Sequence, residues 1–157
     1  MSSALVKEKL LPYLNMKFSS QIIAVILLLV IATSSRAQKM VQKTSDARKL
    51  EINKNQFIGK PLSILLKEIG PRIETALGSP GTNERPGFFN FYFATKAEYD
   101  KYRTQDKFPL TIKVYIKESF EWDKKGKTKE DWLNWTNEDE EKYGDLIVAD
   151  IKVYNEN

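Results

Sequence analysis

The clearest helical pattern in the chain lies over residues 61–69. Apolar residues recur there at intervals of three and four, which places them on one face of an α-helix. Pro61 suits the first turn, because its missing N–H has no helical partner there, and Gly70 followed by Pro71 ends the pattern. The apolar face of this predicted helix consists of Leu62, Leu65, Leu66 and Ile69.

Alternating patterns predict strands over residues 73–77, 88–95, 110–117 and 146–154. The first is short and is expected at a sheet edge, and the second reads FFNFYFAT, a composition that suits a pleated surface. The third is the best strand signal in the chain. The side chains that we expect to face inward are Phe89, Phe91, Phe93, Leu110, Ile112, Val114, Ile116, Ile147, Ala149, Ile151 and Val153.

Short helices are expected between the strands. Thr95 and Glu98 have the spacing of a capping box, Thr128 and Asp131 have the same spacing, and Thr136 precedes an acidic turn. The strands follow one another without a regular βαβ alternation, which favours antiparallel pairing. The sequence therefore predicts an α+β fold: a small antiparallel sheet of about four strands packed on one N-terminal amphipathic helix, with short helical insertions between strands.

An uninterrupted apolar run, residues 22–32, has the features of a secretory signal. Lys17 precedes the run, and Ser35 and Ala37 supply small side chains before a cut between Ala37 and Gln38. The run has 11 residues, whereas a transmembrane helix needs about 20. We therefore expect a cleaved leader, with Met16 as a possible true start. The alternative is an uncleaved anchor made by residues 22–32.

Three regions follow from this pattern. Residues 1–37 are the predicted signal peptide, with the cut at Ala37 and Gln38. Residues 38–54 are rich in polar and charged side chains with little apolar periodicity, so they are predicted to form a flexible linker. Residues 55–157 are predicted to form a single α+β domain, in a secreted or periplasmic location.

Charge and composition exclude several classes of function. The whole chain has 25 basic and 21 acidic residues, but the leader carries four of the former and one of the latter, so the exported part is nearly neutral. Such a balance does not favour binding to nucleic acid. Cysteine and histidine are both absent, which removes disulfides, the commonest metal ligands and the usual activators of nucleophiles. We expect no cofactor and no metal.

The chemistry that remains rests on carboxylates. Glu118, Glu121 and Asp123 lie close to Phe120 and Trp122, and paired carboxylates beside aromatic residues are typical of glycoside hydrolases. A charged segment after a strand explains the same residues, so a small carboxylate-dependent hydrolase stays an alternative. The acidic run 138–141 lacks the alternating donors of a calcium loop. Asn134 begins a glycosylation pattern whose use depends on the host.

The most specific functional hypothesis concerns the outward side of the sheet. If the strands over 88–95 and 110–117 pair, their outward side chains form a surface suited to an acidic or sugar-bearing partner. We therefore predict an exported, non-enzymatic binding domain of the cell envelope or periplasm, with an unknown protein or glycan partner. The Trp122, Trp132 and Trp135 region is a second possible contact, and a structural envelope role is a further alternative. The predicted binding surface consists of Asn90, Tyr92, Lys113, Tyr115 and Lys117.

Overall fold

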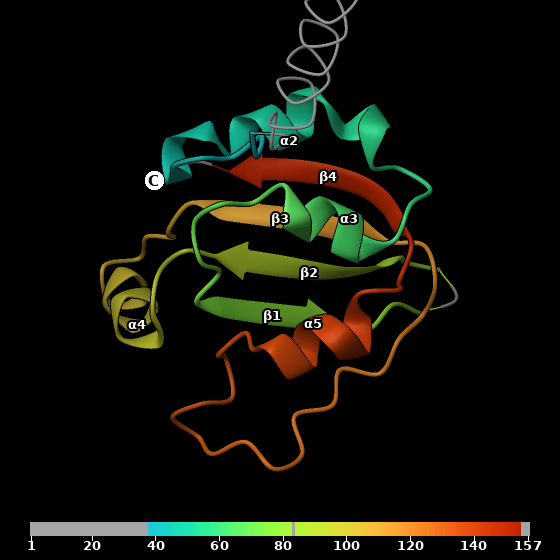
Figure 1. The fold of residues 1–157 in the computed structure, drawn as a ribbon. Helices are drawn as coiled ribbons and strands as arrows, with labels where there is room; N and C mark the ends of the chain where they lie inside the picture. Colours follow the sequence, from blue (N-terminus) through green and yellow to red (C-terminus); the bar gives the residue numbers. More distant parts are fainter. Residues whose placement is uncertain (1–37, 83, 155–157) are drawn as a thin grey trace, which may run out of the picture. The chain divides into compact units, whose positions relative to one another are not determined.

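The computed structural model describes residues 38–82 and 84–154, which form an α+β fold around one antiparallel sheet (Figure 1). The strand order is β1-β2-β3-β4, so each strand pairs with the next one along the chain. The predicted signal peptide, its possible start at Met16, the alternative anchor over 22–32 and the cut after Ala37 lie outside the described residues. Within the described part, no helix is both long and apolar enough to cross a membrane. The strands are β1 (Thr75–Ser79), β2 (Gly87–Tyr92), β3 (Thr111–Ile116) and β4 (Val148–Tyr154).

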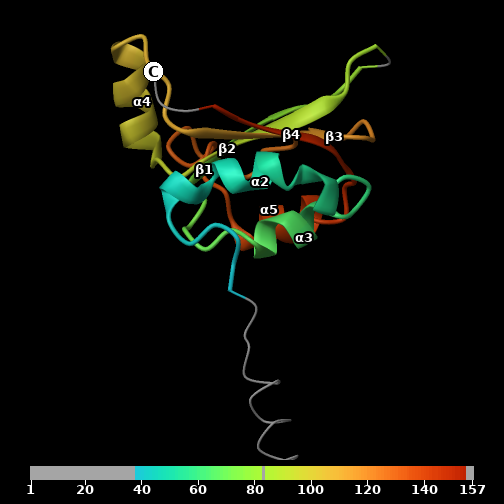
Figure 2. The same ribbon diagram turned by 90° about the horizontal axis from the view of Figure 1, so that it is seen from above.

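Three of the helices lie on one side of the sheet, and α4 lies near the opposite side at one end (Figure 2). The sequence led us to expect a single helix against the sheet, whereas α2, α3 and α5 share that side. Thr95 and Thr136 are the N-caps of α4 and α5, and their hydroxyls accept the backbone N–H of Glu98 and Asp139 in complete capping boxes. The helices are η1 (Thr44–Asp46), α2 (Arg48–Ile52), η2 (Lys54–Gln56), α3 (Leu62–Lys67), α4 (Lys96–Thr104) and α5 (Asn137–Tyr143).

The core lies between the sheet and these three helices. Strand register aligns Ala76, Phe91, Ile112 and Val153 in one row across the four strands, and all four are buried. Because side chains alternate along a strand, the same register places Phe89, Val114 and Ile151 on this face. The Phe side of β2 is therefore the core side, as the alternation predicts.

Residues 38–54, predicted to be a flexible linker, are part of the fold, so this prediction is wrong. Val41 and Leu50 are 0 % exposed and Ala47 is 1 % exposed. Val41 N donates to Glu68 O at 2.9 Å, and Gly70 N donates to Val41 O at 2.7 Å. These few apolar residues gain their burial from partners far along the chain, which explains why local composition did not reveal them.

A β-bulge corrects the predicted inward set of the last strand. Tyr115 pairs with Asp150, but the next residue, Ile116, pairs with Val148. The irregularity lets Val148 face the core, where it is 1 % exposed, while Ile147 and Ala149 are only half-buried. A bulge inserts an extra residue into one strand and shifts the alternation beyond it.

Both edges of the sheet are engaged by other parts of the chain. At β1, Ala76 N donates to Leu133 O at 2.8 Å and Trp135 N donates to Glu74 O at 3.0 Å. At β4, Arg48 donates to Val153 O at 2.8 Å, and Val153 N donates to the Glu51 carboxylate at 3.2 Å. The residues around Thr128 and Asp131 form turns beside β1, not the short helix that their spacing predicts.

Candidate functional site

The side of the sheet away from the three helices carries a partly exposed surface, the open sheet face. Register aligns two rows of outward side chains across the four strands, and α4 covers only the end of the sheet beyond them. Asn90 and Lys113 are direct cross-strand partners, so the structure brings together these residues of the predicted surface. The open sheet face consists of Leu77, Asn90, Lys113 and Lys152 in one row and Ser79, Phe88, Tyr115 and Asp150 in the other.

Lys113 is held between two aromatic rings on this face. Its Nζ lies 3.7 Å from the ring centroid of Phe88 and 5.2 Å from that of Tyr115, and the two centroids are 6.0 Å apart. Both contacts are cation–π interactions, which favour one position of a side chain that is otherwise flexible. No carboxylate among the described residues lies within ion-pair distance of Lys113, so its charge is available to an anion.

Tyr92 does not belong to the accessible surface, so its assignment as a binding residue is wrong. It points to the predicted side of the sheet, but it is 4 % exposed, because Tyr99 of α4 packs against it with ring centroids 5.0 Å apart. Burial, together with the nearby Tyr99, raises the pKa of the Tyr92 hydroxyl well above its usual range. Lys117 is exposed but follows the end of β3, outside the aligned rows.

The carboxylates considered for hydrolysis have separate structural contacts. Glu118 accepts the N–H of Ile147 at 2.9 Å, and Asp123 accepts the N–H of Lys125 at 2.8 Å. The backbone hydrogen bond from Lys125 and the pairing with Lys142 outweigh desolvation and hold the pKa of Asp123 below its usual value of 3.8. A general acid needs a raised pKa, so Asp123 is poorly suited to that role. None of Glu118, Glu121 and Asp123 lines the pocket of about 830 Å³ on the helix side or any of three smaller pockets of the described part.

The tryptophan region is largely part of the core. Trp122 and Trp135 contact Phe89 with ring centroids 5.3 and 5.9 Å apart, and Trp135 is buried. Trp132 is 41 % exposed and remains on the surface. Asn134, the possible glycosylation residue, donates its side-chain amide to Asp131 at 2.9 Å.

A buried ionic cluster, which the sequence did not reveal, joins the segment before α5 to that helix. Asp139 is 5 % exposed and pairs with Lys124 at 3.4 Å and with Lys127 at 2.5 Å. Burial would raise the pKa of Asp139, but hydrogen bonds from Lys127 and Thr136 outweigh it and lower that pKa below 3.8. Burial also lowers the pKa of Lys124 from 10.5 to about 8, although Asp139 opposes this change. Among residues 38–82 and 84–154, no group of three or more carboxylate side chains is placed so that it could hold a metal ion.

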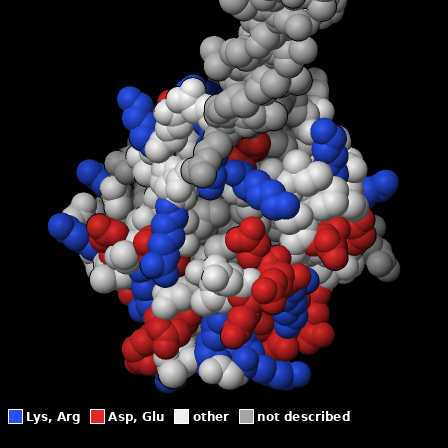
Figure 3. Space-filling view, in the orientation of Figure 1, with Lys and Arg blue, Asp and Glu red and all other residues white. Residues whose placement is uncertain are grey.

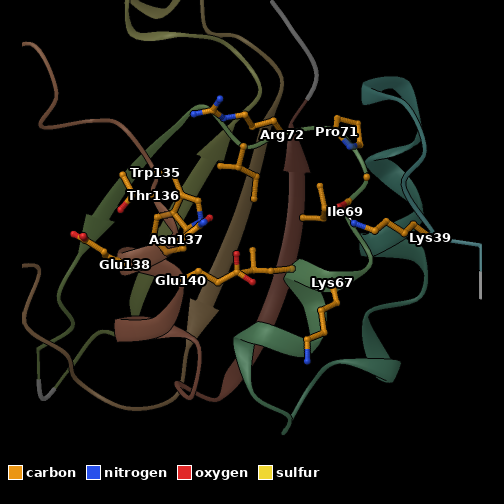
Figure 4. Close-up of a pocket in the computed structure, with 13 residues that line it drawn as sticks. Lys39, Lys67, Ile69, Pro71, Arg72, Trp135, Thr136, Asn137, Glu138 and Glu140 are labelled. Atoms are coloured by element: carbon orange, nitrogen blue, oxygen red, sulfur yellow. Dashed lines mark hydrogen bonds between the residues drawn. The ribbon is translucent and has the colours of Figure 1, made fainter.

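The second accessible site is a pocket of about 830 Å³ on the helix side of the molecule, between α5 and the segment after α3 (Figure 4). Leu66, Ile69, Ile73 and Trp135 form its apolar floor, and they are 5 to 9 % exposed. The other buried apolar side chains of the described part are 4 % exposed or less, so the core reaches the surface mainly here. No local pattern in the sequence indicates this pocket, because its walls come from separate elements. Its polar lining includes Lys39, Lys67, Arg72, Thr136, Asn137, Glu138 and Glu140.

Comparison of this chain with protein-family models, curated proteins and solved structures finds no match. The two accessible sites are therefore the features of the described part from which a function can be inferred.

Proposed function

We propose that this protein is an exported, non-enzymatic binding domain of the cell envelope or periplasm, and that its open sheet face binds an acidic glycan. The observation that carries the proposal is the position of Lys113 between Phe88 and Tyr115 on a side of the sheet that the helices leave uncovered. Export is supported by the apolar run and the small residues that precede Gln38.

The chemistry of the face supports an anionic ligand with apolar surface. An immobilised ammonium group binds a carboxylate or sulfate at a lower entropic cost than a freely rotating one. Aromatic side chains combine a large apolar surface with, in the case of Tyr115, a hydroxyl group for hydrogen bonding. Lys152 adds a second cation in the row of Lys113, whereas Asp150 is paired with Lys54 at 2.6 Å and contributes little free negative charge.

The size of the face favours a narrow ligand over a globular partner. Strands about 4.8 Å apart make a four-stranded sheet about 14 Å wide, and two outward rows lie about 7 Å apart along the strands. The resulting area is on the order of 100 Å², whereas a stable protein interface buries about 800 Å² on each partner. A few units of a polysaccharide chain fit this area without further contacts.

Binding to defined polymers tests the glycan proposal. Protein purified from cells that express the full chain should bind immobilised alginate, a polysaccharide of uronic acids, and should not bind neutral dextran. Lys113→Gln and Tyr115→Ala should each weaken alginate binding at least tenfold. Matched controls elsewhere on the surface, Lys129→Gln and Trp132→Ala, should bind as the parent does, since both positions are exposed and away from the face.

Three outcomes would refute the glycan proposal: equal binding to dextran, unchanged binding by the Lys113 and Tyr115 variants, or tighter binding to polyglutamate, which would indicate an acidic protein partner.

The proposal that the protein is exported has its own measurement. The intact mass of protein recovered from its native host should correspond to a chain that begins at Gln38, and a mass that retains residues 22–32 would support the membrane anchor instead.

A further inference from the structure

A half-buried carboxylate without a partner lies on one wall of the 830 Å³ pocket. Glu140 extends from α5 toward the segment that carries Ile69 (Figure 4). Within the described residues, its side chain takes part in no ion pair or hydrogen bond, although its backbone N–H donates to Thr136 O. A partly desolvated carboxylate is stabilised when it acquires a cationic partner.

The opposite wall of the same pocket carries cations. Lys39 and Lys67 both line it, and Lys67 forms no ion pair or hydrogen bond with the described part of the chain. Lys39 donates to Ile69 O at 3.0 Å, which holds its ammonium group at the pocket. None of these lysines pairs with Glu140, so the two walls keep opposite charges that do not neutralise each other.

The space-filling view agrees with this separation of charge. On the helix side of the molecule, acidic side chains gather mainly over α5 and the lower half, and basic side chains predominate in the upper half (Figure 3). The pocket lies where these two regions meet, because its lining comes from α5 on one side and from Lys39 and residues 66–73 on the other.

We propose that this pocket binds a short peptide with free ends. The amino group lies against Glu140, an apolar side chain lies on the floor of Ile69, Ile73 and Trp135, and the terminal carboxylate lies toward Lys67 and Lys39. The volume of about 830 Å³ falls within the range of about 300 to 1,000 Å³ that is usual for small-ligand sites. A ligand with a single charge leaves one wall unpaired, which is why the opposite charges favour a zwitterion. This site lies on the other side of the sheet from the open sheet face, so the inference does not depend on the proposed glycan function.

Calorimetric titration with the tripeptide Ala-Leu-Ala tests the assignment on protein purified from cells that express the full chain. The free peptide should bind at least tenfold more tightly than its N-acetylated form and than its C-amidated form. Glu140→Gln should weaken binding of the free peptide at least tenfold and abolish the discrimination against acetylation. Lys67→Gln should weaken binding and abolish the discrimination against amidation instead.

Two matched controls separate a local effect from a general loss of charge or fold. Glu141→Gln alters the next residue of α5 and Lys60→Gln alters an exposed lysine, and neither residue lines the pocket. Both variants, and also Lys113→Gln on the open sheet face, should bind the tripeptide as the parent does. Three results would overturn the proposal: no binding of the tripeptide, equal binding of the free and the capped peptides, or an affinity of Glu140→Gln and Lys67→Gln that equals that of the parent.

Discussion

The indole ring of Trp122 occupies the space that a side chain at Gly78 would need. A Cβ built on Gly78 lies 2.4 Å from Trp122 Cδ2, closer than unstrained carbon atoms approach. In the same way, Cε1 of Phe120 lies 2.7 Å from the position that a Cβ on Gly87 would occupy. The segment after β3 therefore packs directly on the backbone of β1 and β2, and the two glycines make this close approach possible.

Gly78→Ala should destabilise the protein by about 1–3 kcal/mol, the usual effect of overpacking in a core. The added methyl group must displace Trp122, which also contacts Phe89 and Tyr143. Urea unfolding measures the free energy, and Ser79→Ala, at the next position of β1, should change it by less than about 0.5 kcal/mol. Equal stability of the Gly78 variant and the parent would show that Trp122 moves away freely.

Removing residues 38–54 should abolish stable folding. Val41 and Leu50 are completely buried, and burial of each such side chain contributes about 1.5–3 kcal/mol. Their loss, together with that of Ala47, is comparable with the total stability of many domains, about 5–15 kcal/mol. A chain that begins at Gln38 should show a cooperative thermal transition by circular dichroism. A chain that begins at Asn55 should show no cooperative transition near the melting temperature of the longer chain. Equal melting temperatures of the two chains would support the interpretation of residues 38–54 as a linker.

Asp139→Asn should destabilise the protein by about 3 kcal/mol, because it leaves two largely buried lysines without their carboxylate. Lys127→Met should destabilise more than Lys124→Met. Lys127 makes the shorter ion pair and also donates to Asn134 O at 2.8 Å, whereas burial already disfavours the charged form of Lys124. Urea unfolding at pH 7 gives the order, with Glu141→Gln as the control on α5. The reverse order of the two lysine variants would contradict this description of the cluster.

Stability should fall in acid. The pKa values of Asp123, Asp139 and Asp150 are lower in the folded protein than the ordinary value of 3.8. The unfolded chain then binds more protons than the folded one as the pH drops through that value, so the free energy of unfolding decreases. The stabilisation should be fully present above about pH 5 and lost progressively below about pH 4. Denaturation curves at a series of pH values measure the slope, which should be shallower for Asp139→Asn. An equal slope in the variant would contradict the lowered pKa of Asp139.

Local patterns predicted the features that depend on neighbouring residues. The alternation over 110–117 predicted β3 and its core side, and the Thr95 and Thr136 spacings predicted the starts of α4 and α5. The outward position of Asn90, Lys113 and Tyr115 followed from the same alternation. These features need only the geometry of one helix or one pair of strands.

Features that depend on distant parts of the chain were not predictable in this way. The bulge beside Ile116 shifts the alternation of β4. The alternation of β2 places the ring of Tyr92 on the outward side of the sheet, but α4 covers it there. The buried ion pairs of Asp139 and the pocket beside Glu140 each join segments that are separate in the sequence. Their residue types are those of ordinary surface positions, so only the packing of the chain distinguishes them.

The contacts at the two edges of the sheet limit how this molecule can associate with others. Leu133 and Trp135 hydrogen-bond to the β1 side, and Arg48 and Glu51 bind the backbone C=O and N–H of Val153 in β4. An extended chain from another molecule could add to the sheet at these positions only by displacing them. The sheet therefore offers other molecules its side chains and not its strand edges, and single substitutions can change those side chains without any rearrangement of the backbone.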